Sequence, residues 1–100
     1  MYFGREKMLK FFSFKSILDM AREGDLDGVK SKIEAGKDIN KRDEDGKTAL
    51  IWASEKGHTA VVEFLISKGA NMETQDKDGK TALMLASLGG HKAVVEILIS

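Results

Sequence analysis

The amino-acid sequence predicts an all-α solenoid, a stack of helix–turn–helix units joined by tight turns. The chain repeats itself at an offset of 33 residues. Residues 45–50 recur at 78–83, 57–58 at 90–91, 61–63 at 94–96 and 65–67 at 98–100. A fixed period of this length is typical of stacked repeats, in which no unit buries its apolar face alone. Such proteins commonly present an extended surface to another macromolecule and rarely have a catalytic cleft.

Capping residues predict two helices in the middle unit. Thr48 caps a short helix that continues through Glu55, and Gly57 ends it in the left-handed conformation. A second helix is expected over residues 59–68, and Gly69 ends it in the same way. Helices of about ten residues are too short to persist alone in water, so their stability must come from stacking on neighbours.

The apolar residues of the second helix fall at helical spacing. The expected inward stripe is Val62, Leu65 and Ile66, with Val61 and Phe64 beside it. Small residues are expected to let neighbouring helices approach closely, and these are Ala53, Ser54, Ala86 and Ser87. An aspartate at Val62 or Leu65 should unfold the array, because it would bury an unpaired charge.

The middle and last repeats each begin with an Asp-rich loop, at residues 43–46 and 76–79. Asp first and Gly fourth suits a type I turn, because Asp accepts a local backbone hydrogen bond and Gly tolerates unusual angles. The aspartates, Asp43, Asp45, Asp76 and Asp78, also resemble pieces of a calcium loop. A calcium loop requires a bidentate Glu at its end, whereas Lys-Thr follows the glycine here. We therefore interpret the aspartates as turn residues.

Residues 13–42 contain an earlier, degenerate copy of the unit. Its alignment pairs Gly24 with Gly57, Val29 with Val62, Ile33 with Ile66 and Gly36 with Gly69. We divide the chain into an aromatic and basic segment, residues 1–12, and one repeat domain, residues 13–100, with repeats over 13–42, 43–75 and 76–100. The favoured role of the N-terminal segment is to cap the first repeat, and an amphipathic membrane-surface helix is the alternative.

Composition excludes several classes of function. Sixteen basic and sixteen acidic side chains cancel, so no overall field attracts nucleic acid or an anionic membrane. The chain has no cysteine and therefore no disulfide or thiolate metal site. No segment has the roughly 20 apolar residues that span a bilayer, and charges interrupt every candidate signal sequence. We expect a cytoplasmic protein with no membrane span and no nucleic-acid partner.

The full pattern closely resembles the ankyrin repeat. In the middle unit the matching residues are Gly46, Thr48-Ala49-Leu50, Ala53, Gly57-His58, Val61-Val62, Leu65-Ile66 and Gly69-Ala70-Asn71. In the last unit they are Asp76, Gly79, Thr81-Ala82-Leu83, Ala86, Gly90-His91, Val94-Val95 and Leu98-Ile99. The family commonly has Thr-Pro-Leu-His where this chain has Thr-Ala-Leu followed by Ile51 or Met84, a departure that exchanges a polar tether for apolar contact. The resemblance implies an ankyrin-type helix-turn-helix solenoid with β-turn fingers.

The two histidines, His58 and His91, are weighed as general bases or metal ligands. Both follow a glycine at the same repeat position, and no acidic or Cys partner recurs beside them. A structural role in the bend explains them better. The sequence shows no paired catalytic carboxylates and no nucleophile with a base, so we expect no enzyme activity, no cofactor and no metal.

Two residues differ between repeats in an informative way. Trp52 aligns with Leu85, which favours core packing over exposure at a groove. Leu88 aligns with Glu55 and Arg22, so it should face solvent, where an apolar side chain favours a partner contact.

The resemblance implies that a protein partner docks on turn tips and first-helix surfaces. The candidate partner-binding residues are Arg42, Glu44, Asp45, Lys47, Glu55, Lys56, Gln75, Lys77, Asp78, Lys80 and Leu88. Two alternatives stay open: a scaffold or regulatory segment of a longer repeat protein, and self-association through the C-terminal edge. Val94, Val95 and Leu98 are expected to leave that edge apolar.

Overall fold

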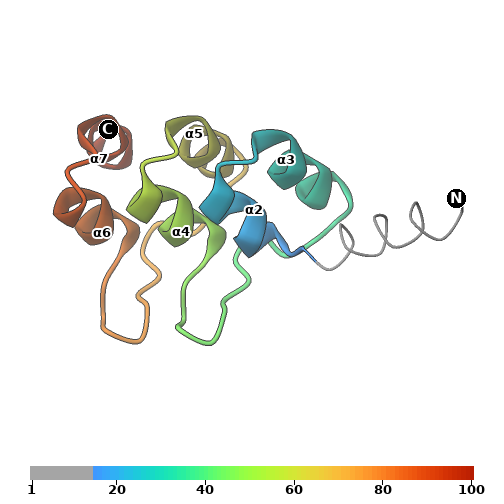
Figure 1. Cartoon of the computed structure of the whole chain (residues 1–100), viewed down its shortest axis with the longest axis horizontal. Coiled ribbons are helices and arrows are strands. Elements are labelled where there is room, and N and C mark those ends of the chain that lie inside the picture. The colour runs from blue at the N-terminus through green and yellow to red at the C-terminus, as the bar shows by residue number, and fades with distance from the viewer. Residues whose placement is uncertain (1–14) are drawn as a thin grey trace, which may run out of the picture.

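The computed structural model describes residues 15–100, and the predicted N-terminal segment, residues 1–12, lies outside this range. The described helices are α2 (Ile17–Glu23), α3 (Leu26–Glu34), α4 (Ala49–Lys56), α5 (Thr59–Ser67), α6 (Ala82–Leu88) and α7 (Lys92–Ile99). They form three consecutive helix pairs. Figure 1 shows α2, α4 and α6 in one row and α3, α5 and α7 in a second row. The loops before α4 and α6 extend away from the first row as two fingers. The all-α repeat solenoid expected from the sequence is confirmed.

Side-chain caps start the first helix of every pair. The Thr48 hydroxyl accepts a hydrogen bond from the Ile51 N–H at 3.2 Å, as the sequence predicts. Thr81 does the same in the last repeat, and Ser16 begins α2 with a capping box that includes Asp19. Each cap satisfies a backbone donor that the helix itself leaves unpaired.

Glycines end the helices where the sequence predicts. Gly57 follows α4 with φ 77°, in the left-handed region where a side chain is strained. The second helix of the middle pair runs over Thr59–Ser67, within the predicted 59–68, and Gly69 after it has φ 84°. The chain therefore reverses direction sharply enough for the two helices of a pair to pack together.

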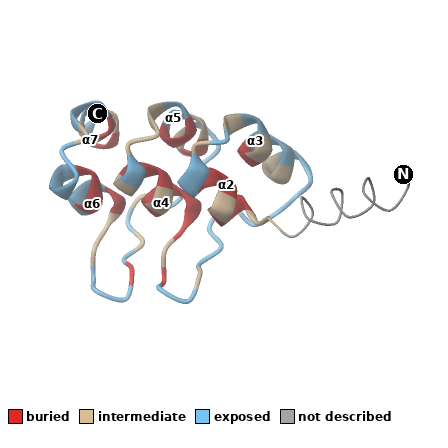
Figure 2. Ribbon diagram, in the orientation of Figure 1, coloured by how far each residue is buried: buried red, intermediate tan, exposed pale blue. Residues whose placement is uncertain are grey.

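The core lies between the two rows and between neighbouring pairs, where Figure 2 shows the buried residues. Val61, Val62 and Leu65 are buried, whereas Ile66 and Phe64 are only partly buried, so the inward stripe includes Val61 in place of Ile66. Of the small residues, Ala53, Ser54 and Ala86 are fully buried and Ser87 is exposed. Within its row, α4 packs on both α2 and α6. The close approach of first helices therefore depends on these small side chains.

The first aspartate of each finger, Asp43 or Asp76, stabilises the turn at the tip. The Asp43 carboxylate accepts hydrogen bonds from the N–H groups of Asp45 and Lys47, both at 2.9 Å. Asp76 repeats this arrangement in the next finger. The two fingers are joined by a backbone hydrogen bond from the Lys77 N–H to the Asp45 carbonyl, at 3.0 Å. The predicted turn role of these aspartates is confirmed.

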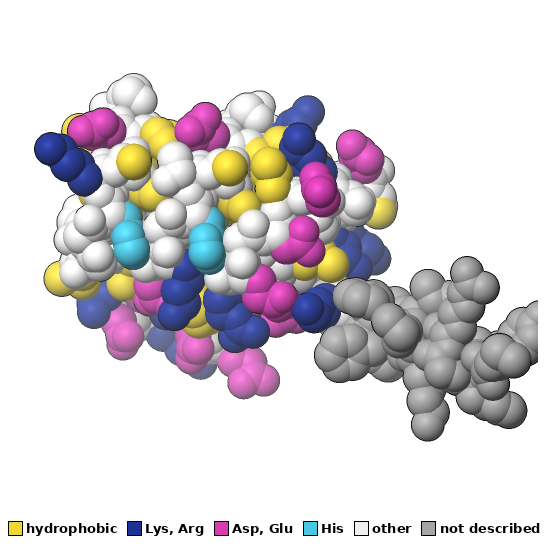
Figure 3. Space-filling view, turned by 45° about the horizontal axis from the view of Figure 1, so that its top comes forward, with side chains coloured by type: hydrophobic (Ala, Val, Ile, Leu, Met, Phe, Trp, Pro, Cys, Tyr) yellow, Lys and Arg dark blue, Asp and Glu magenta, His cyan; other side chains and the backbone are white. Residues whose placement is uncertain are grey.

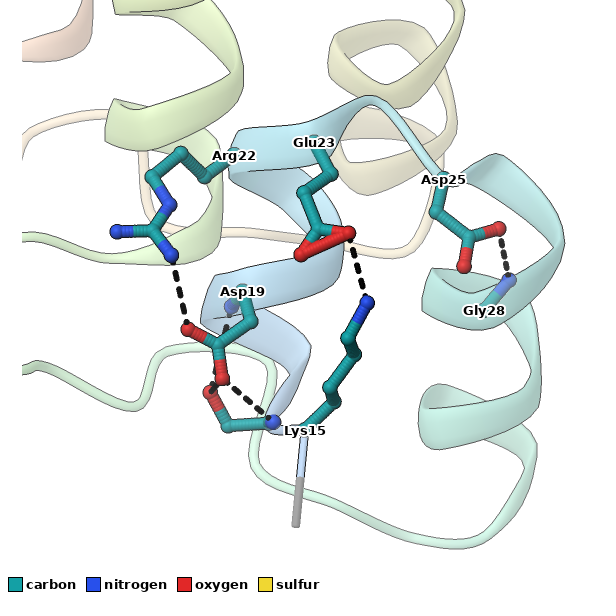
Figure 4. A network of polar contacts seen from close by, with 7 residues as sticks. Lys15, Asp19, Arg22, Glu23, Asp25 and Gly28 are labelled. Carbon is teal, nitrogen blue, oxygen red and sulfur yellow. Dashed lines mark hydrogen bonds and ion pairs between the residues drawn. The ribbon is translucent and has the colours of Figure 1, made fainter. Parts of the chain in front are cut away.

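The first repeat is stabilised by polar contacts on its surface (Figure 4). Lys15 pairs with Glu23 at 2.9 Å, and Arg22 pairs with Asp19 at 3.3 Å. Asp25 caps α3 by accepting the Gly28 N–H at 2.9 Å. These exposed pairs contribute little stability individually, but they give the first helix pair a polar exterior.

Candidate partner-binding surface

The two histidines connect adjacent repeats. Nε2 of His58 lies 2.9 Å from the Arg22 carbonyl oxygen, and Nε2 of His91 lies 2.8 Å from that of Glu55. Because a carbonyl only accepts hydrogen bonds, Nε2 must carry the proton in both rings. Figure 3 shows the two imidazoles (cyan) in a line along the stack. Each histidine therefore fastens its repeat to the preceding one, and the predicted structural role is confirmed.

A glycine makes room for each imidazole. A Cβ atom at Gly24 would lie 2.7 Å from Nδ1 of His58, and a Cβ atom at Gly57 would lie 2.5 Å from Nδ1 of His91. Contacts this close are excluded, so any side chain at either glycine would displace the ring. Glycine is required at both positions for two reasons: the backbone is left-handed, and the imidazole occupies the space where a side chain would lie.

Trp52 lies at the centre of the surface on the finger side of the stack. Its indole N–H donates a hydrogen bond of 2.7 Å to Asp43 Oδ2. Nζ of Lys47 lies 4.4 Å from the ring centroid, and Cζ of Arg22 lies 5.4 Å from it, both within the range of cation–π attraction. The ring is partly buried and packs against the core, so it is both a packing residue and part of this surface.

These contacts also stabilise the charge of Asp43. Burial alone would raise the pKa of this carboxyl group. The hydrogen bonds from the Lys47 N–H, the Trp52 indole and the Asp45 N–H, with the nearby Lys47 charge, outweigh burial and hold the pKa below its ordinary value of 3.8. The carboxylate is therefore a fixed negative acceptor at the base of the finger.

Several predicted partner-binding residues already have partners within the chain. Lys47 pairs with Glu55 at 2.9 Å, and their side chains are only 18% and 25% exposed. The Arg42 guanidinium donates hydrogen bonds to the carbonyl oxygens of Gly46 and Gln75, at 3.1 and 2.7 Å. These three side chains shape the surface and connect the fingers, and their polar groups are largely engaged.

The other predicted residues reach solvent in two groups. The finger group is exposed, except for the partly buried Lys80, and contains Glu44, Asp45, Gln75, Lys77, Asp78 and Lys80. The helix group is exposed and contains Lys56 and Leu88. Leu88 is 72% exposed, as its alignment with Glu55 predicts. The structure places one group on the two fingers and the other at the ends of α4 and α6.

Arg22 is a further member of this surface, which the sequence did not predict. Arg22 is exposed, and its guanidinium lies over the same indole ring as Lys47. The signal was present, because Arg22 aligns with Glu55 and Leu88 at the 33-residue period. One position of the first helix therefore carries a cation, an anion and an apolar side chain in successive repeats.

The apolar edge of the last repeat differs from the prediction. Val94 and Leu98 are buried, at 1% and 9% exposure, and Val95 is partly exposed. Val94 and Leu98 face the interior of their own helix pair, as Val61 and Leu65 do one repeat earlier. Among residues 15–100, the exposed large hydrophobic residues are Leu83, Met84, Leu88 and Ile99, at 36%, 49%, 72% and 66%.

Within residues 15–100, no group of three or more His, Asp or Glu side chains is arranged to hold a metal ion. In the same part of the chain, no helix is both long and apolar enough to cross a membrane.

The sequence matches the family model for ankyrin repeats, in three copies, over residues 17–100. The chain belongs to the ankyrin repeat family. The match covers the six helices in the described part of this ankyrin-repeat chain, and the helix pairs and fingers described above are the three repeats.

Several curated proteins resemble part of this ankyrin-repeat chain. It is 47% identical over 51 residues to the 26S proteasome non-ATPase regulatory subunit 10 of Mus musculus, covering 50% of this chain and 22% of that protein. It is 44% identical over 45 residues to acyl-CoA-binding domain-containing protein 4 of Oryza sativa subsp. japonica, covering 45% of this chain and 13% of that protein. It is 49% identical over 43 residues to the acyl-CoA-binding domain-containing protein 6 homolog of Dictyostelium discoideum, covering 42% of this chain and 15% of that protein. The similarity therefore spans less than a quarter of each relative.

Proposed function

We propose that this chain is a protein-binding module that uses the finger side of its stack. The observation that carries the proposal is the position occupied by Arg22, Glu55 and Leu88. The helix caps and core residues recur closely in the middle and last repeats, while this position changes from Glu55 to Leu88, and the degenerate first copy has Arg22 there. Residues that stacking does not constrain can vary with the partner, so specificity resides at positions of this kind.

The relatives support binding in preference to catalysis. Parts of this chain resemble short segments of a proteasome non-ATPase regulatory subunit and of an acyl-CoA-binding domain-containing protein, which cover only 22% and 13% of those proteins. A segment shared by proteins with such different names fits a general interaction module better than any one chemistry. The cytoplasmic location expected from the sequence remains a prediction.

The exposed charges define the partner's chemistry. Glu44 and Asp45 make the first finger tip acidic, whereas the second finger carries the cations Lys77 and Lys80, the latter partly buried, on either side of the exposed Asp78. We expect a protein that places a basic group against the first finger, an acidic group against the second, and an apolar side chain on Leu88. Complementary charges of this kind set orientation and association rate, while the apolar contact supplies affinity.

Alanine at Glu44, Lys77 and Leu88 together tests this assignment. The partner is first identified by affinity capture with the whole chain, and its Kd is then measured by titration calorimetry. We expect the triple variant to bind at least about 10-fold more weakly, which corresponds to about 1.4 kcal/mol.

A matched control replaces three exposed charges on the second row of helices, Lys30, Glu34 and Glu63, by alanine. The control should bind with an unchanged Kd. An unchanged Kd for the finger-side variant, or an equal loss for the control, would refute the placement of the binding surface.

A further inference from the structure

The first repeat contains a small cavity whose charged lining is almost entirely basic. The cavity has a volume of about 220 Å³ and is formed by the start of α2, α3 and the loop that follows α3. Four lysines line it, Lys15, Lys32, Lys37 and Lys41, against a single carboxylate, Asp38. The whole chain has sixteen basic and sixteen acidic side chains, so this excess of one sign is a local property of the cavity.

Three of these lysines occupy positions that are uncharged and buried in the middle repeat. At the offset of 33 residues the pairs are Lys15 with Thr48, Lys32 with Leu65, and Lys37 with Ala70. The middle-repeat residues are 1%, 0% and 8% exposed. The backbone is equivalent in both repeats, because the Lys37 N–H donates to the Lys32 carbonyl at 3.0 Å as the Ala70 N–H does to the Leu65 carbonyl. The first repeat therefore keeps this turn and replaces uncharged side chains by cations.

Ion pairs neutralise only part of this positive charge. Lys15 pairs with Glu23 at 2.9 Å (Figure 4). Within residues 15–100, no ion pair includes Lys32, Lys37 or Lys41. Three ammonium groups at one cavity therefore have no carboxylate paired with them in the described part of the chain.

The one carboxylate in the lining has a role in the loop. Oδ1 of Asp38 accepts the Asn40 N–H at 2.9 Å, and the Asp38 carbonyl accepts the Lys41 N–H at 3.3 Å. A single aspartate also leaves the lysines in excess. Residues 1–14 contain three basic side chains and one acidic side chain, so they add no net negative charge.

A polar surface alone does not require side chains of one sign. Like charges that share a cavity repel one another, and a bound anion turns this repulsion into attraction. The lysine ammonium group is a compact charge with three hydrogen-bond donors and is a common ligand of phosphate. Pockets that enclose drug-sized ligands have volumes of roughly 300–1,000 Å³, so this smaller cavity suits a small anion.

We infer that this cavity binds two adjacent phosphate groups, either a diphosphate or two phosphates on one small molecule. Lys32, Lys37 and Lys41 supply the positive charge, and Asp38 holds the loop that positions two of them. The phosphates come from a free metabolite or from a lipid headgroup. The inference is independent of the proposed binding surface on the finger side.

The test titrates inorganic diphosphate into the whole chain and follows the backbone amides by heteronuclear NMR. Ionic strength is held constant, because salt screens attraction between charges. We expect saturable shifts at residues 32 and 37–41. Lys32→Leu with Lys37→Ala installs the residues of the middle repeat, so this double variant should fold, and it should bind diphosphate at least about 10-fold more weakly.

The matched control removes two exposed lysines elsewhere, by Lys56→Ala with Lys92→Ala. The Kd for diphosphate should not change. An equal loss in both double variants would show attraction to net charge alone and would overturn the inference, as would shifts spread over lysines throughout the chain.

A single variant keeps the test decisive if the first double variant does not fold. Lys41 is exposed in a loop, so Lys41→Ala should keep the fold and should weaken diphosphate binding at least about 3-fold. An unchanged Kd for Lys41→Ala would overturn the inference.

Cosedimentation with vesicles distinguishes the two sources of phosphate. The vesicles contain phosphatidylcholine with about 10% cardiolipin, a lipid whose headgroup carries two phosphates. Sedimentation with the vesicles that diphosphate competes away would support the cavity and identify a lipid headgroup. Saturable diphosphate binding without cosedimentation would support the cavity and identify a free metabolite.

Discussion

The middle and last repeats have nearly the same apolar residues, yet those residues lie in different environments. Ile51 is 1% exposed in the middle repeat, and Met84 at the same position in the last repeat is 49% exposed. Val61 and Val94, by contrast, are both 1% exposed. Val61 and Val94 are each buried within their own helix pair. The burial of Ile51, in contrast, depends on the repeat that follows it. Burial in this chain therefore has a local component and a neighbour component, and the two can be separated by mutation.

The largest contrast is expected from a buried charge. Val62 is fully buried, whereas its counterpart Val95 is partly exposed. Val62→Asp should abolish the cooperative unfolding transition at 25 °C, because its carboxylate would lie unpaired in the core. Val95→Asp should keep the fold, since its carboxylate can reach water. Far-UV circular dichroism with thermal melting distinguishes the two variants. A folded Val62→Asp variant would contradict a contribution of the neighbouring repeat to burial at this position.

Truncating the residues that face the following repeat should give the next largest contrast. Ile51→Ala should lower the free energy of unfolding by about 2–5 kcal/mol, since it leaves a cavity between repeats. Met84→Ala should lower it by about 1 kcal/mol or less, because half of that side chain already contacts solvent. Urea denaturation measures both. Equal losses of unfolding free energy in the two variants would mean that Ile51 and Met84 are equally well packed.

A smaller, pH-dependent effect is expected at the finger of the middle repeat. Asp43→Asn should cost about 1–2 kcal/mol at neutral pH, because it weakens the acceptor of three hydrogen bonds. The pKa of Asp43 is depressed in the folded chain, so the charge contributes its full stability well above the ordinary value of 3.8. That contribution is lost as the pH falls through the depressed pKa. The difference between the wild type and Asp43→Asn should therefore narrow below about pH 4, and a gap that is constant down to about pH 2 would exclude a charge effect.

The smallest contrast concerns two serines at one repeat position. Within the described residues, the buried Ser54 hydroxyl has no hydrogen-bond partner, whereas the exposed Ser87 hydroxyl donates to the Leu83 carbonyl at 2.8 Å. Ser54→Ala should raise the free energy of unfolding by about 1 kcal/mol, since it removes a desolvated polar group. Ser87→Ala should change it by less than about 0.5 kcal/mol. Thermal melts of both variants check this, and a destabilised Ser54→Ala would point to an interaction of the hydroxyl in solution.

Local signals in the sequence predicted most of the fold. Thr48 and Gly57 mark the ends of α4 because capping and left-handed geometry depend on residue type and immediate neighbours. The 33-residue period then placed the equivalent residues of the last repeat. Side-chain direction was harder to predict. Val94 and Leu98 were expected at the C-terminal edge, but helical geometry turns them toward their own helix pair, which buries them.

The candidate surface was less predictable, because it depends on pairings that cross repeats. From the sequence, Arg42 is expected to be a solvent-exposed charge. In the structure its guanidinium donates a hydrogen bond to the carbonyl of Gln75, 33 residues later. Lys47 and Glu55 also pair with each other, within one repeat and from opposite ends of α4. Leu88, by contrast, could be placed at the surface from alignment alone, since no polar partner competes for it. Long-range polar contacts need coordinates in three dimensions.

The histidine contacts between repeats also bear on how the chain folds during synthesis. The two imidazole contacts join residues only 36 positions apart, so no tie between repeats waits for a distant part of the chain. Low sequence separation of this kind favours fast folding. Ribosomes add about 5–20 residues per second, so a repeat period takes roughly 2–7 s to emerge. Each new histidine then meets a glycine and a carbonyl that are already in place, and the earlier repeats serve as the template on which the later ones assemble.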